Sequence, residues 1–554
     1  MLRSSRPVLG LLLAITLAGS LALVSPGAQA APTGSHGTDP SPRALLHRAQ
    51  RALDRVEQIF SSTGTTVRGD ATMALRNLAE TKSALPPSQQ REAERYFARP
   101  TASGSNCPGD YACYKSTAQR FERCNSRICV HYVKQGSGTR RDNTNGVDPE
   151  DDGKSGRWPG RAHNGVPDMV EFTLKSLSHI DAVYRKAGYR STLGDGHQGG
   201  DSRRDIYLGN IGSKGVYGYC TSDDPKLAYD AAGTKHPAVS AYCVLDNDYS
   251  RSEFPYHSPR QNLAVTAAHE YFHAVQFAYD FDEDAWMMEA TATWAEDELY
   301  TKINDNRQYL PLGPMGKPWV NLDAYSNSSG NSGYLHQYGT WIFFRYLTER
   351  YPTKQGILPT LVRRIWNLSV GKSGYSVAAI KQALAERGTS LDTELARFVV
   401  ANRRPALNYS EGRAYTPAPL GAKPETLSTA LLAPRSNRRA PALPHLAAAT
   451  YQYVPGTGVT QLDIHVTSAA TADVEAAVVV HRTDGSYRRT IFRANGTDDS
   501  VAFDPATVAW VEVSLINAGT RFSCWDRTSY AWMYTCQGHS EDNNSGAAMV
   551  VTAS

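Results

Sequence analysis

Residues 264–298 constrain the fold more than any other part of this 554-residue chain. They contain the motif H-E-x-x-H at His269 to His273, and no Gly or Pro lies between positions 261 and 298, which favours helix. Residues four apart lie on one face of a helix, so both imidazoles can reach one metal ion, with Glu270 beside them. We therefore expect a helix that binds a metal through His269 and His273, with Glu270 as a base that takes a proton from water.

A hydrolytic metal site of this kind needs a third protein ligand and one open position. Glu289 follows His273 by 16 residues, beyond the acidic stretch 280–284. This distance allows the first helix to end and an antiparallel second helix to present the Glu289 carboxylate. Glu296, further along the second helix, is a candidate for orienting a ligand imidazole. A plain surface acid is an equal alternative for Glu296.

The two helical segments resemble the gluzincin zinc peptidases. In that family H-E-x-x-H is followed by W-x-x-E-[AG]-x-A-x-[WY]-x-E, which matches positions 286–296 here. The resemblance implies Zn²⁺ as the cofactor, His269, His273 and Glu289 as its ligands and Glu270 as the general base. The spacing is shorter than in the best-known gluzincins, so a tighter turn is expected between the helices.

A wider set of motifs is similar to a group of secreted metalloproteases from myxobacteria and actinomycetes. The set comprises N-G-V-P-D at 164–168, D-I-Y-L at 205–208, H-E-Y-F-H-A-V-Q at 269–276 and Y-G-T-W-I-F-F-R-Y-L at 338–347. Together these motifs cover roughly residues 70 to 405. Few members of the group have a defined substrate, so the likeness implies the chemistry better than the biological role.

The same resemblance bears on the group that stabilises the oxyanion. In aminopeptidase-like gluzincins, Tyr-x-x-Gly opens a comparable helix and its tyrosine is the donor. Aligned on Gly339, that position is His336 in this chain, which departs from the pattern. We expect His336 slightly ahead of Tyr338 as the donor, and not both, because positions i and i+2 diverge on a helix. A structural helix-start His and a packed Tyr remain the alternative.

The first 30 residues have the form of a secretory signal. Arg3 and Arg6 precede an apolar stretch at 8–24 and a small-x-small cleavage site at 28–30. The formal net charge of +4 falls to +2 without these two arginines, which gives no reason to expect binding to nucleic acid or, after signal cleavage, to a membrane. We expect a secreted, extracellular protein.

The eight cysteines, an even number, are typical of an exported protein with disulfides. Their positions predict local pairs Cys220–Cys243 and Cys524–Cys536. The cluster of four at positions 107, 113, 124 and 129 allows three connectivities, which the sequence does not distinguish. A zinc site in that cluster is disfavoured, because no C-x-x-C spacing is present.

Periodicity and composition predict an α+β fold with several parts. After the signal (1–30) and a flexible leader (31–42), helical spacing at 43–98 predicts three helices, either a removable pro-segment or a permanent part of the fold. Residues 99–404 should form the catalytic domain, with a mixed α/β upper half and a mainly helical, zincin-like lower half. A Pro- and Ala-rich linker (405–447) precedes short alternating runs (448–554) that predict an all-β sandwich.

A second metal is an open question at the acidic loop 148–153. It begins like an EF-hand loop, D-x-E-x-D-G, but position twelve is Pro159 rather than a bidentate Glu, which rules out a standard EF-hand. An irregular Ca²⁺ site that uses Asp148, Asp151, Asp152 or Asp168 is one alternative. A solvated acidic loop is favoured over it.

These features together predict a zinc-dependent endopeptidase with a protein or peptide substrate. A zinc hydrolase of a non-peptide ester or amide is an alternative that the sequence leaves open. A third reading is an exported, non-catalytic protein whose β-sandwich binds a substrate or a surface, but an intact Glu270 beside the metal argues against it.

Overall fold

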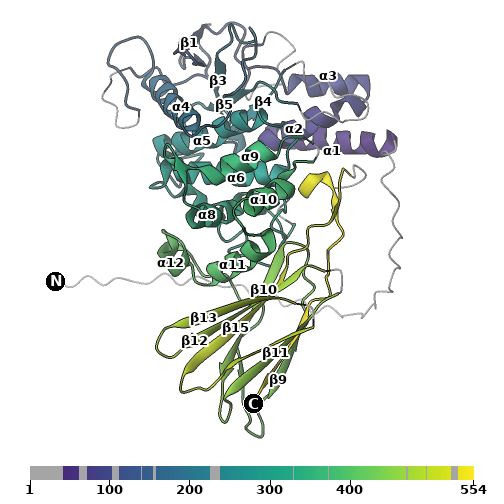
Figure 1. The fold of residues 1–554 in the computed structure, drawn as a ribbon. Coiled ribbons are helices and arrows are strands. Elements are labelled where there is room, and N and C mark those ends of the chain that lie inside the picture. The colour runs from purple at the N-terminus through teal and green to yellow at the C-terminus, as the bar shows by residue number, and fades with distance from the viewer. Residues whose placement is uncertain are drawn as a thin grey trace, which may run out of the picture. The chain divides into compact units, whose positions relative to one another are not determined.

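The computed structural model describes residues 42–61, 71–102, 112–138, 140–151, 153, 158–224, 237–328, 330–371, 373–469, 472–494, 496–525 and 534–554. Helices and several β-sheets make up this part of the chain, in agreement with the predicted α+β class (Figure 1). The predicted signal at 1–30 lies outside the described residues. Among the helices that are described, none is long and apolar enough to cross a membrane.

Three helices precede the first sheet, as the spacing predicts. They are α1 (Pro42–Ser61), α2 (Ala71–Thr81) and α3 (Pro87–Arg95), and a short 3₁₀ turn, η1 (Lys82–Ala84), joins the last two. Helix α2 is buried along nearly its whole length, and its side chains belong to the same hydrophobic core as the sheet that follows. It packs against α1 on one side and against a sheet strand on the other (Figure 1).

The first sheet has five strands in the order β1-β2-β3-β5-β4. Strands β2 (Ile128–Val133), β3 (Arg204–Gly209) and β5 (Tyr242–Asp246) are parallel, and helix α4 (Asp168–Lys186) connects β2 to β3. The sequence predicts these four elements because apolar residues run through each of them.

The antiparallel edge strands, β1 (Arg120–Cys124) and β4 (Gly218–Thr221), were not predicted. Strand β1 is polar and β4 has only four residues, so neither shows a clear apolar alternation. Each edge strand is tied to its neighbour by a disulfide, Cys124–Cys129 between β1 and β2 and Cys220–Cys243 between β4 and β5. The predicted pair Cys524–Cys536 is also present, and Cys113 is disulfide-bonded, while Cys107 lies outside the described residues.

Helices fill the region between the first sheet and the C-terminal strands (Figure 1). Helix α5 (Pro259–Phe277) packs against α4, β4 and β5, and α6 (Ala285–Tyr300) packs against α5. The others are η5 (Asp305–Tyr309), α7 (His336–Gly339), α8 (Trp341–Arg350), α9 (Thr360–Leu368), α10 (Ser376–Ala385), α11 (Leu391–Arg403) and α12 (Pro405–Asn408), with a small hairpin of β6 (Lys354–Gln355) and β7 (Leu358–Pro359).

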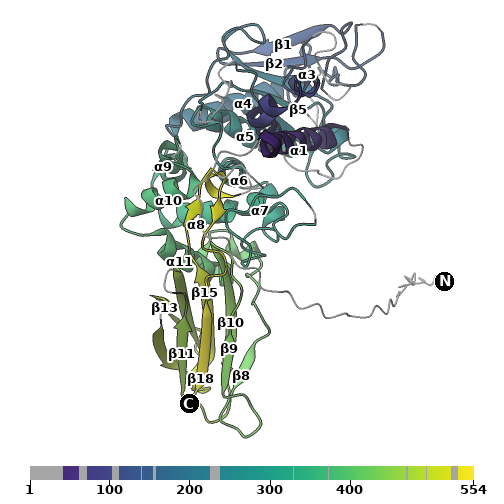
Figure 2. The ribbon, with the colours of Figure 1, turned by 90° about the vertical axis from the view of Figure 1, so that its right-hand side faces the viewer.

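Two further sheets lie in the C-terminal part. One has the order β13-β12-β15-β10-β8 and the other β14-β11-β18-β9, and Figure 2 shows their strands below the helices. Side chains from both sheets belong to one hydrophobic cluster. Their strands are β8 (Glu425–Leu427), β9 (Ser436–Arg439), β10 (Ala447–Pro455), β11 (Gln461–Thr467), β12 (Val474–Arg482), β13 (Tyr487–Arg493), β14 (Thr497–Ala502), β15 (Val508–Asn517) and β18 (Ala548–Ala553). Two-residue strands β16 (Phe522–Ser523) and β17 (His539–Ser540) pair with each other.

The stretch 405–447, predicted as a linker, contains structure. It holds α12, the 3₁₀ turn η6 (Gly412–Ala414) and strands β8 and β9, which add an edge to each of the two C-terminal sheets. Strand β9 has the sequence Ser-Asn-Arg-Arg, which shows no apolar alternation. It lies at the edge of its sheet and pairs with β18 through backbone hydrogen bonds, which do not depend on apolar side chains.

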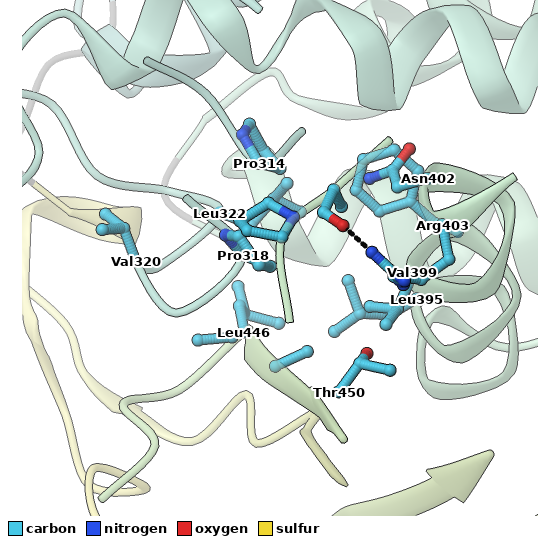
Figure 3. Close-up of a pocket in the computed structure, with 15 residues that line it drawn as sticks. Pro314, Pro318, Val320, Leu322, Leu395, Val399, Asn402, Arg403, Leu446 and Thr450 are labelled. Carbon is cyan, nitrogen blue, oxygen red and sulfur yellow. Dashed lines mark hydrogen bonds between the residues drawn. The ribbon is translucent and has the colours of Figure 1, made fainter. Parts of the chain in front are cut away.

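The helices and the C-terminal sheets meet at a small, mostly apolar crevice (Figure 3). Leu322, Leu395 and Leu446 come together there from a loop, from α11 and from the residue before β10. Arg403 at the end of α11 donates to the carbonyl of Ala418 and pairs with Glu512 of β15 over 2.7 Å. This junction is filled by the protein's own side chains and holds α11 against the sheet.

Candidate active site

Helices α5 and α6 place the predicted metal ligands opposite one another. A capping box begins α5, in which Ser258 and Gln261 satisfy each other's backbone N–H, with Pro259 in the first turn. The acidic stretch 280–284 then forms the turn. Asp284, the last residue before α6, accepts bonds from Ser376 Oγ at 2.6 Å and from the backbone N–H of Cys536 at 2.8 Å.

Glu289 lies between the two histidines of the motif. Its Oε2 is 3.2 Å from Nε2 of His269, and its Oε1 is 3.3 Å from Nε2 of His273. His273 and Glu289 are fully buried, and His269 is 9% exposed. The three residues form a group whose ligand atoms all lie within 4.8 Å of one another, so the turn brings together the set that the sequence predicts.

Nδ1 of each imidazole, the nitrogen that faces away from Glu289, is hydrogen-bonded by a different residue. Glu296 Oε1 lies 2.6 Å from Nδ1 of His269, and Gln276 Oε1 lies 2.7 Å from Nδ1 of His273. Because a side-chain carbonyl oxygen only accepts, Gln276 requires a proton on Nδ1 of His273 and leaves Nε2 as a lone pair. Gln276 itself donates to the carbonyl of Met288 on α6, which fixes its orientation.

Glu270 points to a cavity beside this group. The cavity has a volume of about 80 Å³, and Glu270 is 7% exposed to it. Its walls are Ala71, Gly215, Val216, Tyr217, Gly218, Val265, Thr266, His269, Glu270, Glu296, Asp305, Tyr309, Leu335 and Tyr338. The site is therefore enclosed by α2, the chain leading into β4, helices α5 and α6, η5 and the start of α7.

Tyr338 lies at this cavity, whereas His336 does not. The Tyr338 ring is 6.1 Å from the ring of His269 and stacks on Tyr309 at 5.0 Å. His336 is fully buried away from the cavity walls, and its Nδ1 donates to the carbonyl of Leu312 over 2.9 Å. The sequence favours His336 slightly as the donor, but the position on the cavity wall is that of Tyr338. Helix α7 is a single turn that follows Leu335 in a left-handed conformation, with φ 53°.

Burial and neighbouring charges shift the pKa values of the site. Burial raises the pKa of Glu270, and the imidazoles of His269 and His273 offset part of that rise. Burial also raises the pKa of Glu296 to about 7. For Glu289 burial acts in the same direction, but the two imidazoles outweigh it and hold its pKa well below the usual range.

The predicted calcium residues organise their own loop. Asp151 accepts backbone bonds from Asn164 at 3.1 Å and Gly165 at 2.6 Å, and Asp168 accepts one from Gly153 at 3.1 Å. Asp152 lies outside the described residues. Another acidic group, Asp246, Asp248 and Glu253, likewise binds the backbone and hydroxyl groups of its surroundings.

Two residues that contact the motif were not predicted to act there. Gln276 is detectable in principle, since it lies three positions after His273 on the same helical face. Thr72, which contacts Glu270, is 198 residues away in sequence, and no local sequence pattern predicts this contact.

Searches of protein-family models and of curated proteins find no match to this chain.

Proposed function

We propose that this chain is a secreted, zinc-dependent endopeptidase. The observation that carries the proposal is the position of the Glu289 carboxylate between the Nε2 atoms of His269 and His273. Nε2 of His273 and Oε1 of Glu289 are buried and make no hydrogen bond within the described part of the chain. Buried polar atoms of this kind call for a partner, and a cation between them would supply one.

The donor set fits zinc. Two imidazole nitrogens and one carboxylate oxygen are the protein ligands of a common class of catalytic zinc site. When bound there, zinc would lower the pKa of a water molecule and polarise a substrate carbonyl. Glu296 and Gln276 hold the ligand imidazoles by their outer nitrogens and so keep Nε2 directed at the site.

Glu270 is suited to move the proton. It lines the cavity, and burial raises the pKa of its carboxyl, which makes the carboxylate a better proton acceptor. Glu270 would take a proton from the attacking water and deliver it to the leaving amine. Tyr338, which also lines the cavity, would donate a hydrogen bond to the developing oxyanion.

Secretion is supported by the apolar leader at the N-terminus and by the disulfides, which are typical of exported proteins. The C-terminal sheets carry no part of the site. Their proposed role is to bind a substrate or a surface.

The size of the cavity favours a second candidate. Its 80 Å³ is small beside the roughly 300–1,000 Å³ of common ligand sites. The second candidate is a zinc hydrolase of small esters or amides. Small esters or amides would fit within such a space, whereas a polypeptide would have to extend beyond it.

The decisive experiment measures metal content and hydrolysis together. The purified mature protein should contain about one zinc per chain and should cleave an unfolded protein substrate. A chelator should abolish cleavage and added zinc should restore it. Cleavage confined to a panel of small esters and amides would favour the second candidate, and a protein that binds no zinc would refute both.

A further inference from the structure

One hydrogen bond joins the N-terminal helices to the proposed base. Thr72, in the first turn of α2, donates from Oγ1 to Oε2 of Glu270 over 3.0 Å. The same hydroxyl accepts a bond from the backbone N–H of Cys220 on β4, also over 3.0 Å. Thr72 is 1% exposed, so neither bond competes with bulk water.

The two bonds fix the direction in which the hydroxyl points. A hydroxyl has one proton to donate, and accepting the N–H of Cys220 leaves that proton for Glu270. The backbone of edge strand β4 therefore orients Thr72, and Thr72 holds Oε2 of Glu270. Since Glu270 also lines the cavity, its other oxygen is the one left to exchange a proton with water.

We infer that Thr72 is a positioning residue for the general base Glu270, an inference that rests on the proposed function. A hydrogen bond to one carboxylate oxygen restricts rotation of the carboxylate group. It thereby keeps the free oxygen directed at the site of proton transfer, which general-base catalysis requires.

The same contact favours α2 as a permanent part of the enzyme over a removable pro-segment. Arg76, one turn after Thr72, donates to the carbonyl of Glu283 in the turn before α6, and Leu75 and Leu78 are fully buried in the core. After α3, Arg99 pairs with Asp195 over 2.6 Å and with Asp223 over 2.7 Å. Loss of residues 71–102 would uncover the core and release the base.

The test compares three variants of the full-length protein. Thr72→Val removes the hydroxyl at nearly constant volume, and Thr72→Ser restores it. Thr81→Val, on the same helix, removes a hydroxyl that donates to the carbonyl of Asn77 and has no other hydrogen bond within the described part of the chain, so it serves as the control. Should Thr72→Val fail to accumulate, Thr72→Ala gives the same comparison.

With zinc content equal, Thr72→Val should lower kcat by about ten- to a hundredfold with little change in KM, as the loss of one charge-assisted hydrogen bond predicts. Thr72→Ser should recover most of that loss, and Thr81→Val should retain wild-type kcat. The active wild-type protein should also retain residues 71–102 by mass spectrometry. A kcat in Thr72→Val equal to or above that of the wild type would overturn the inference, and a rise would identify α2 as an obstruction.

A second measurement needs no activity. In the metal-free protein, the backbone amide of Cys220 should exchange with solvent faster in Thr72→Val than in Thr72→Ser. Equal exchange would show that the contact is absent and would overturn the inference even if the protein cleaves peptides. A wild type that cleaves nothing, with the exchange difference present, would instead refute the proposed function alone.

Discussion

Oε1 of Glu296 lies 2.6 Å from Nδ1 of His269, on the opposite side of the imidazole ring from Glu289. A carboxylate in this position orients the ring and raises the basicity of the nitrogen that faces the metal. The equal alternative, that Glu296 is a plain surface acid, does not hold, since this residue is buried.

Glu296→Gln should weaken zinc binding by about ten- to a hundredfold. Glu298→Gln is the matched control, because Glu298 lies on the same helix but pairs with Arg345 over 2.9 Å. Zinc affinity measured by competition with a chromogenic chelator checks the prediction. If both variants bind zinc as the wild type does, Glu296 has no role in orienting His269.

Glu270→Gln should keep the zinc and lose turnover. The amide preserves the shape of the side chain but cannot accept a proton, so kcat should fall by about two to four orders of magnitude. His273→Ala should lose both zinc and activity, because it removes a ligand. Metal analysis beside initial rates separates the two effects, and an active Glu270→Gln protein would contradict the mechanism.

Tyr338→Phe should lower kcat by about a hundredfold, with zinc retained, because it removes the proposed oxyanion donor. His336→Gln should leave kcat unchanged, since His336 bonds to Leu312 and lies off the cavity walls. Steady-state kinetics on one peptide substrate decide between them. A strong loss of kcat in the His336 variant alone would instead identify His336 as the oxyanion donor, as the sequence slightly favours.

His336 should also make stability depend on pH. Burial lowers its pKa to about 4, from an ordinary value near 6.5. Between these values the unfolded chain binds the proton and the folded chain does not, so acidification through this window destabilises the fold, by about 3 kcal/mol at most.

His336→Gln should flatten this dependence. Thermal unfolding at pH 7 and at pH 4.5 should show a smaller drop in Tm for His336→Gln than for the wild type. His179→Gln, at an exposed position of α4, should behave as the wild type does. An unchanged pH slope in His336→Gln would place the acid sensitivity in other groups.

The sequence predicts the parts of the site that lie on the neighbouring helices α5 and α6. The grouping of His269, Glu270 and His273 follows from helical spacing. The choice of Glu289 is what the gluzincin resemblance implies, and the length of the turn allows it. The sequence favours His336 slightly over Tyr338, whereas it is Tyr338 that lines the cavity. This arrangement depends on the backbone just before α7, where Leu335 has a positive φ. The contact of Thr72 with Glu270 depends on how α2 packs on β4, which no local pattern encodes.

The secondary-structure elements also differ in how well the sequence predicts them. Elements with a continuous apolar face, such as β3, α4 and β12, can be recognised from their own residues. Strands β1, β8 and β9 are polar or very short, and their existence depends on the neighbour with which they pair. The β-propensity of such a segment says little about whether it forms a strand, because strand formation there depends on pairing with a neighbouring strand.

The bond from the backbone N–H of Cys536 to Asp284 joins points 252 residues apart in the sequence. Asp284 is buried, and without this donor and Ser376 its carboxylate would lose two of the bonds that offset its burial. The turn that brings Glu289 to the histidines is thus completed by a segment near the end of the chain. A partly synthesised or C-terminally truncated chain would therefore carry every residue of the motif and still lack a finished site.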